Sequence, residues 1–581
     1  MTGPSRSQTK PKNQAVRRAQ ISSSTEARAV NTQVASNPSS DLSPPTPPKA
    51  SITTRDWTLE GLIAKGKQFR EIPRVSAQQS GDVLKGTIEK HEQSGVPLII
   101  EGWHKHHKWS SDIFDVHWLE KHHGNDTILT RNVHDRRDKE LPVAEFLNKC
   151  RETEPFAKPD ETERLYGKDA ACPPQWKDWL DSRVLPASLL PGGDNDLMQH
   201  LPRSGEVESL LCYHGVGDTF TPCHKDLCGS SGHNLMCYSE KGGSSFWFMT
   251  ASQTAPEVAD YFQSELGQEL DWEGHVATVN ELARAPFPVY IGEQKLGDLI
   301  LVPPRSCHQV VNYGGLTMKI SWSRMTVRGL GIALHYELPI YRRVCRPEQY
   351  RVKSVLYRSL LYYTSRLNIA MSRRAIPTAR LSSRQTSNIN MSLGDYGSSE
   401  EDDVPIASVL HPPAELSPLH VHDSQKSRFV DALQSLLTLF DEVLVDEYAQ
   451  EHASFPHIFG KSTMEYSQPS TPPWRKGTEG DTYSCTIACD FCGADIFQSF
   501  FECQTCVPEG AARPTALGDG LLICAPCYVE GRSCSCTKMA PVQCRPFELL
   551  LEKRNRAAAV LRQFETHTTS HQVRNTKLEE R

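Results

Sequence analysis

Two histidines and one aspartate have the residue types and the spacing of a metal site. His224 and Asp226 flank Lys225, and strand residues two apart point to the same face, so both side chains would project together. The apolar run 299–302 ends shortly before His308 and would deliver this third side chain nearby. Two imidazoles and one carboxylate bind one face of a metal and leave the other face open, which suits non-haem Fe(II). The sequence therefore predicts an iron site in which His224, Asp226 and His308 are the catalytic residues.

Eight cysteines near the C-terminus form four closely spaced pairs. They are Cys489, Cys492, Cys503, Cys506, Cys524, Cys527, Cys534 and Cys536. In a reducing compartment, repeated Cys-x2-Cys pairs indicate zinc, because two neighbouring thiolates reach one tetrahedral ion. Four pairs predict two Zn²⁺, with the first and third pairs on one ion and the second and fourth on the other. The roles of Cys485 and Cys544 are left open.

Composition limits the classes of protein that the chain can belong to. A length of 581 residues allows two to four domains, and a net charge of −6 confines any nucleic-acid contact to local patches. No apolar run reaches the length of a membrane span, and the N-terminus has no apolar segment typical of a secretory signal. We therefore expect an intracellular protein without membrane contact, whose 18 cysteines are thiols and metal ligands.

Shifts in composition and periodicity divide the chain into segments. In order, these are a disordered basic tail (1–54), an oxygenase-like domain (55–345, with a core at about 205–326), a helical extension (346–367), a disordered linker (368–425), an amphipathic helix (426–451), a second linker (452–483), a zinc module (484–546) and a C-terminal helix with its tail (547–581).

The central segment favours a mainly β domain with added helices, an α+β class. Short apolar strands are expected at 209–213, 235–238, 245–249, 299–302 and 317–323. No long helix separates them, which favours an antiparallel sandwich or barrel over a doubly wound sheet. A helix is expected within 109–123, with Ser110 or Ser111 as its cap, and a further helical stretch runs from 328 to 367.

Taken in order, several segments resemble the JmjC family of Fe(II)- and 2-oxoglutarate-dependent oxygenases. These are residues 97–103, 165–169, 213–215, 221–226, Asn234, 246–248, 297–303, and His308 before Trp322. The resemblance covers about residues 55–345 and implies a double-stranded β-helix, or jelly roll. It also implies Fe(II) bound by the triad and 2-oxoglutarate as co-substrate. The cysteine module looks similar to ZZ or RING modules, although Cys534-x-Cys536 stands where a ZZ module has His-x-His.

The resemblance assigns further roles where residues match. Thr221 matches a position that contacts the 2-oxoglutarate carboxylate, Asn234 a co-substrate-binding asparagine, and Tyr213 a tyrosine facing the substrate pocket.

The expected lysine just before residues 246–247 is missing, because Ser244 and Ser245 stand there. Lys241 and Lys319 are the two candidates for binding the distal carboxylate. We favour Lys319, because a lysine among apolar strand residues is costly to bury without a partner such as the co-substrate.

By this resemblance the protein would be a nuclear histone lysine demethylase. Its partners would be a histone tail or another methylated protein, with chromatin proteins bound through the zinc module, while direct DNA contact is left open. Two alternatives stand beside this interpretation. One is a protein side-chain hydroxylase, and the other is a chromatin-binding scaffold with a weak or inactive iron site.

Overall fold

A computed structural model of the chain describes residues 52–374, 423–448, 487–503, 505–506, 521–543, 545 and 547–579. The predicted tail up to residue 51, both linkers for the most part, Cys485 and Cys544 lie outside these ranges. The structure is described from residue 52 onward, three residues before the predicted start of the domain at residue 55. Thr54 is fully buried, and its backbone N and its Oγ1 both donate to Asp218 Oδ1 at 2.6 Å.

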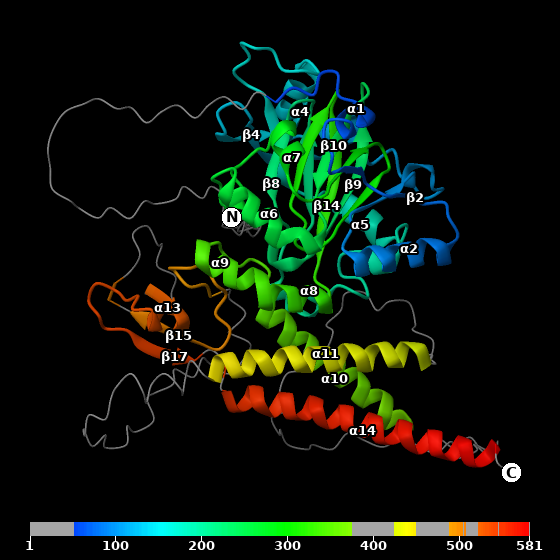
Figure 1. The fold of residues 1–581 in the computed structure, drawn as a ribbon, viewed down its shortest axis with the longest axis vertical. Helices are drawn as coiled ribbons and strands as arrows, with labels where there is room; N and C mark the ends of the chain where they lie inside the picture. Colours follow the sequence, from blue (N-terminus) through cyan, green and yellow to red (C-terminus); the bar gives the residue numbers. More distant parts are fainter. Residues whose placement is uncertain are drawn as a thin grey trace, which may run out of the picture. The chain divides into compact units, whose positions relative to one another are not determined.

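Eight consecutive strands build the centre of the fold. They are β7 (Leu211–Gly215), β8 (Phe220–His224), β9 (Ser231–Ser239), β10 (Ser244–Met249), β11 (Val289–Gln294), β12 (Leu299–Val302), β13 (His308–Tyr313) and β14 (Thr317–Arg324). Four lie side by side in the order β11-β10-β13-β8, and the other four in the order β12-β9-β14-β7. Figure 1 labels β8 and β10 of the first group and β9 and β14 of the second. All the pairings within these two groups are antiparallel. This division of strands between two sheets is the arrangement of a jelly roll.

Shorter strands extend both sheets. The smaller sheet gains β1 (Phe69–Glu71), and the larger one gains β2 (Arg74–Ser76), β3 (Leu98–Glu101), β4 (Thr127–Asn132), β5 (Asp138–Pro142) and β6 (Leu165–Ala171). The pairs β1–β11 and β2–β3 are parallel, so the sheets are mixed at their margins.

An apolar cluster with members from both sheets shows which side chains lie between them. It includes Ile99, Trp247, Ile300 and Val310. Directly paired residues share a face and alternate residues return to it, so Thr221, opposite Val310, also faces inward. The interior therefore combines apolar packing with polar side chains, which is the composition of a ligand pocket.

Helices cover the outer faces of the sheets. They are α1 (Leu59–Ile63), α2 (Gly81–Ser94), α3 (Val116–His123), α4 (Val143–Glu152), α5 (Pro174–Asp181), α6 (Ala255–Ser264) and α7 (Val279–Arg284). Phe146 of α4 and Trp176 of α5 share one buried cluster with Met318 and Trp322 of β14. The expected cap of the 109–123 helix was wrong. The helix begins at Val116, and the side chain of Asp115 accepts hydrogen bonds from the backbone N of His117 and Trp118.

The helical stretch after β14 is not continuous. It contains α8 (Val327–Ile332), a π-helical turn (Ala333–Glu337), α9 (Leu338–Val344) and, after a break, α10 (Val352–Arg374). Because α10 runs past residue 367, the first residues assigned to the linker are helical. α10 packs with α11 (Asp423–Tyr448) and α14 (Phe547–Glu579) around Leu360, Phe440 and Leu550 (Figure 1). Among the helices of the described ranges, none has the length and apolar character needed to cross a lipid bilayer.

Candidate metal centre and co-substrate pocket

The structure brings His224, Asp226 and His308 together at one end of the jelly roll. His224 ends β8, His308 begins β13, and the two residues are paired across these antiparallel strands. Their ring centroids lie 4.0 Å apart, and His308 Nε2 lies 3.8 Å from Asp226 Oδ1. One ligand atom from each of the three side chains falls within 4.8 Å of the others. The chain thus forms a two-histidine, one-carboxylate cluster from residues 84 positions apart (308 − 224).

The donor atoms of this cluster fit a divalent metal ion. His224 Nδ1 lies 2.8 Å from the Pro222 carbonyl oxygen, and His308 Nδ1 lies 3.0 Å from that of Ser306. Each Nδ1 therefore carries the proton and donates, which leaves Nε2 with its lone pair free for a metal. Burial, with a smaller contribution from His308, lowers the pKa of His224 to about 3, so the imidazole is neutral. Asp226 Oδ2 is buried, and no described residue donates a hydrogen bond to it.

Two neighbours fix the space around the cluster. A Cβ on Gly232 of β9 would lie 1.9 Å from Asp226 Oδ2, so only glycine leaves room for the carboxylate there. The Trp247 ring stacks on the His308 ring at 5.9 Å between centroids and 19° between planes. The close approach of Gly232 was missed from the sequence, because it depends on the register between β9 and the loop after β8.

The predicted pocket residues line the interior beside the cluster. The Thr221 hydroxyl is hydrogen-bonded to the Tyr166 hydroxyl at 3.0 Å. Asn234 Oδ1 accepts from Gln294 Nε2 at 3.1 Å, which leaves the amide Nδ2 as the group available to a ligand. The Tyr213 hydroxyl donates to Asp169 Oδ1 at 2.8 Å, and burial raises the pKa of this phenol well above its usual value.

Lys319 is buried in the same interior, with 1% of its surface exposed. Its Nζ donates to Asn312 Oδ1 at 2.6 Å and to Thr317 Oγ1 at 3.3 Å, and both acceptors are neutral. Burial lowers the pKa of Lys319 to about 7. Within the part of the chain that the structure describes, no carboxylate forms an ion pair with this amine. A buried amine whose described partners are neutral fits a site for an anionic ligand, because such a ligand would stabilise the charged form of the amine. Asn312, which positions the amine, was not identified from the sequence.

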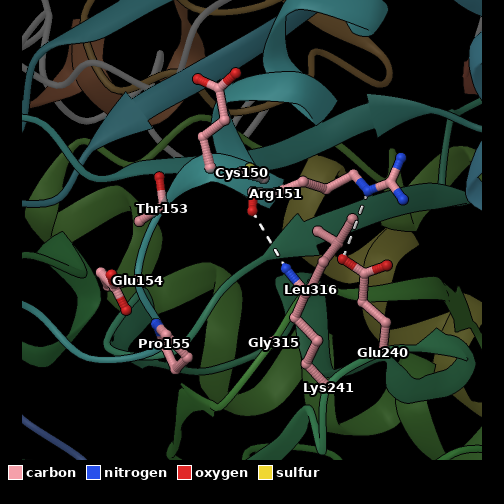
Figure 2. Close-up of a pocket in the computed structure, with 10 residues that line it drawn as sticks. Cys150, Arg151, Thr153, Glu154, Pro155, Glu240, Lys241, Gly315 and Leu316 are labelled. Atoms are coloured by element: carbon pink, nitrogen blue, oxygen red, sulfur yellow. Dashed lines mark hydrogen bonds and ion pairs between the residues drawn. The ribbon is translucent and has the colours of Figure 1, made fainter.

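Lys241 occupies a different environment. It is exposed in the turn between β9 and β10, with a positive φ of 49°, and its Nζ donates to the Arg151 carbonyl oxygen at 3.3 Å. Figure 2 shows it in a surface pocket formed by the segment from Cys150 to Pro155, Glu240, Gly315 and Leu316. None of the His224, Asp226 and His308 cluster lines this pocket.

We expect Lys319→Ala to raise the KM for 2-oxoglutarate by about tenfold or more, because a hydrogen bond to a charged group contributes roughly 1.5–3 kcal/mol. Lys241→Ala should leave that KM unchanged, because its amine lies on the surface. Steady-state succinate formation at varied 2-oxoglutarate measures both. Unaffected kinetics in Lys319→Ala would reject Lys319 as the carboxylate partner.

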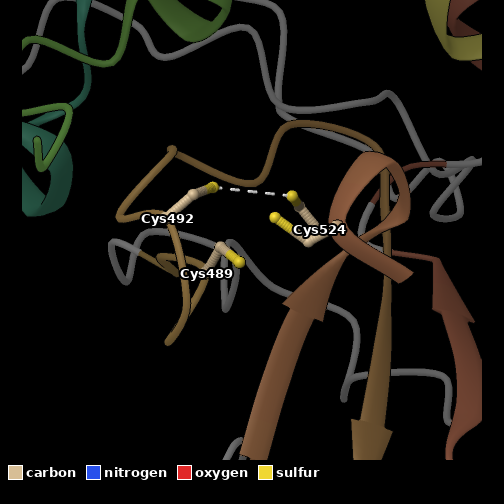
Figure 3. Close-up of side chains that lie close together, drawn as sticks. Cys489, Cys492 and Cys524 are labelled. Atoms are coloured by element: carbon tan, nitrogen blue, oxygen red, sulfur yellow. Dashed lines mark hydrogen bonds between the residues drawn. The ribbon is translucent and has the colours of Figure 1, made fainter. Parts of the chain in front are cut away.

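The eight predicted zinc ligands lie in two groups of four thiols. One group is Cys489, Cys492, Cys524 and Cys527, and the other is Cys503, Cys506, Cys534 and Cys536. In each group the sulfur atoms fall within 4.8 Å of one another. Figure 3 shows Cys489 and Cys492 on one loop facing Cys524.

Strand pairing brings these cysteines together. β15 (Ser499–Cys503) pairs with β16 (Leu521–Cys524) and β17 (Ala540–Gln543), and α13 (Ala525–Val529) follows β16. The Sγ atoms of Cys492 and Cys524 lie 3.7 Å apart, close to the roughly 3.8 Å that tetrahedral Zn–S bonds of about 2.3 Å imply. The interleaved pairing expected from the sequence matches these two groups, and both fit Zn²⁺.

Comparison with known proteins agrees with this geometry. Residues 211–323 match the JmjC domain, described as a hydroxylase domain, and this range runs from β7 to β14 and contains His224, Asp226 and His308. Over 372 residues the chain is 28% identical to C-module-binding factor A of Dictyostelium discoideum. The match covers 64% of this chain and 31% of that protein, so the chain spans about a third of the length of this relative. Residues 211–323 therefore resemble a JmjC domain both in sequence and in the arrangement of strands β7 to β14.

Proposed function

We propose that this protein is an Fe(II)- and 2-oxoglutarate-dependent oxygenase that demethylates lysine side chains of histones. The observation that carries the oxygenase assignment is the cluster of His224, Asp226 and His308 beside a buried Lys319 that has no carboxylate partner among the described residues. The three clustered side chains would bind a divalent metal, and the Lys319 amine would attract a dianionic co-substrate. The JmjC match over the same strands supports this combination.

Each residue of the pocket would have a definite part in the reaction. His224, Asp226 and His308 would hold the metal through Nε2 and carboxylate oxygens, and Lys319 would bind the distal carboxylate of 2-oxoglutarate. Thr221 and Asn234 would orient the co-substrate through a hydroxyl and an amide. The apolar side chains around Trp247 would keep water from the site. Bound Fe(II) would supply the redox chemistry that couples oxidative decarboxylation of 2-oxoglutarate to hydroxylation of a substrate C–H bond.

Aromatic and acidic groups beside the metal cluster support a methylammonium substrate. The Tyr166 and Tyr213 rings stack with centroids 6.4 Å apart, and Asp169 accepts from the Tyr213 hydroxyl. Aromatic faces and a nearby carboxylate attract a cationic methylated amine. Hydroxylation of an N-methyl group gives a hemiaminal, whose C–N bond breaks to release formaldehyde and the shorter amine. The two thiol clusters would hold zinc and present a surface to chromatin proteins in the nucleus.

The assay that tests this proposal uses the full chain with Fe(II), 2-oxoglutarate and an array of methylated histone peptides. We expect formaldehyde and succinate in equal amounts on a methyl-lysine peptide, and neither product from Asp226→Ala. Succinate without formaldehyde, together with a mass gain of one oxygen on the peptide, would replace demethylation by side-chain hydroxylation. Absence of succinate with every peptide would reject the oxygenase and favour the chromatin-binding scaffold.

The hydroxylase alternative has an observation of its own. The JmjC domain that matches residues 211–323 is described as a hydroxylase domain, and the same metal and co-substrate chemistry yields a stable alcohol on an ordinary side-chain carbon. The assay above separates the two products by mass.

A further inference from the structure

Lys225 lies between two of the metal-cluster residues, yet its side chain takes a different direction. It follows the last residue of β8, where neighbouring side chains alternate between faces, so it projects away from His224 and Asp226. Its side chain is 4% exposed, and its Nζ lies 2.9 Å from Glu337 Oε2 and 3.1 Å from Asp271 Oδ1. The metal-binding loop is therefore held from behind by two buried carboxylates.

Glu337 also binds the segment that carries the other histidine. Its side chain is fully buried, and Oε1 accepts from Arg305 Nε at 3.0 Å. Arg305 stands three residues before His308 and has a positive φ of 65°. One carboxylate thus joins the loop of His224 and Asp226, through Lys225, to the loop of His308, through Arg305.

The helical segment that contains Glu337 adds a second anchor. Glu337 ends a π-helical turn, a rare conformation that is frequently found at functional sites. One turn later, on α9, the Tyr341 hydroxyl accepts from the backbone N of Cys228 at 2.9 Å. Asp226 therefore lies between two residues, Lys225 and Cys228, that are both tied to the segment from Glu337 to Tyr341.

Charges in this buried network are balanced. Asp271 also pairs with Arg346 at 3.3 Å, and Arg346 pairs in turn with Glu273. The three cations Lys225, Arg305 and Arg346 face the three carboxylates Asp271, Glu273 and Glu337. Removal of one member leaves an uncompensated charge, which strains the segments that carry its partners.

We propose that Glu337 is a positioning residue that presets the spacing of His224, Asp226 and His308 before a metal binds. The inference rests on the proposed metal site and goes beyond it, because Glu337 touches neither metal nor substrate. Without its carboxylate, the loops before His308 and around Asp226 lose their common anchor, and metal binding must then order them. Residues that orient metal ligands from outside typically change metal affinity by about 10–100-fold.

The test measures metal affinity without turnover. Mn²⁺ is a suitable probe, because it prefers nitrogen and oxygen ligands over the cysteine thiolates elsewhere in the chain. Free Mn²⁺ is counted by electron paramagnetic resonance in titrations of the full-length protein, and Asp226→Ala gives the background. We expect Glu337→Gln to raise the dissociation constant by about tenfold or more at unchanged stoichiometry.

Glu447→Gln is the matched control. Glu447 is also a buried carboxylate, and its Oε1 accepts from Lys353 Nζ at 2.8 Å, but this pair joins α10 to α11. The control should bind Mn²⁺ as the wild type does. If Glu337→Gln does not fold, Arg305→Met removes one arm of the network and should also weaken binding, while Arg305→Lys should restore it.

The outcomes separate the inference from the proposed function. An unchanged dissociation constant in Glu337→Gln, or a lower stoichiometry with unchanged affinity, overturns the positioning role. The second result would mean only that fewer molecules are folded. Wild-type protein that binds no Mn²⁺ above the Asp226→Ala background overturns the metal site itself, and the inference with it.

Discussion

Asp226→Ala is expected to lower 2-oxoglutarate turnover by more than about 100-fold while leaving the metal-free protein as stable as the wild type or more stable. The loss of activity follows because removing a metal ligand lowers activity more than removing a residue that only orients a ligand. Stability should not fall, because Asp226 Oδ2 is buried without a hydrogen-bond donor among the described residues. Such a group costs about 1–3 kcal/mol in the absence of a metal. Succinate formation and the thermal unfolding of chelator-treated protein measure the two effects.

Asp115→Ala provides the opposite pattern. Asp115 caps α3 and should lose about 1 kcal/mol of stability on substitution, with normal turnover. If Asp226→Ala instead destabilised the metal-free protein and kept its activity, Asp226 would be a structural residue and not a metal ligand.

Removal of zinc is expected to unfold the described residues of the cysteine module, 487–503, 505–506 and 521–543. The buried members of its apolar cluster are Ile496, Phe500, Ile523 and four cysteines, so few fully buried apolar side chains stabilise it. Structural zinc sites contribute about 10–16 kcal/mol, which is far more than so small a core supplies. Hydrogen exchange in this segment should become fast after treatment with a strong chelator and slow again when Zn²⁺ is restored.

Metal content gives a second readout of the same sites. The wild type should contain two zinc ions per chain, and Cys527→Ser should lose at least the ion of its own group. Cys345→Ser is the control, because Cys345 is an exposed free cysteine outside both groups. Two zinc ions retained in Cys527→Ser, or protection that survives complete chelation, would contradict a structural role for the metal.

Strands with a recognisable apolar pattern were predictable from the sequence, whereas β13, whose pattern is interrupted, was not. Residues 299–302 were expected as a strand and form β12, because four consecutive aliphatic side chains leave little choice. β13 was missed, because Gln309 and Asn312 interrupt its apolar pattern. Both are buried and hydrogen-bonded, Gln309 to the backbone of Ala277 and Asn312 to Thr219 and Lys319. Buried polar side chains on either face of a strand interrupt the apolar alternation by which a strand is recognised in a sequence.

The residues of the candidate site also fall into those that the sequence could predict and those that it could not. His224, Asp226 and the paired cysteines could be named because their spacing along the chain is short, and His308 because it follows the apolar run 299–302 and also matches the resemblance. Glu337 and Gly232 could not be named. Glu337 lies 112 positions from Lys225, and the role of Gly232 exists only once β9 lies against the loop after β8. Contacts of this kind follow from the packing of the sheets, and no local pattern encodes them.

The alternation of the two cysteine groups along the chain limits how this region can be shortened. A polypeptide that stops between residues 506 and 524 contains half of each set of thiols and completes neither tetrahedron. One that stops between residues 527 and 534 completes only the first set. During synthesis the ribosome must therefore release almost the entire region before the second set of thiols is complete, and a nonsense mutation anywhere upstream of residue 524 leaves both sets incomplete.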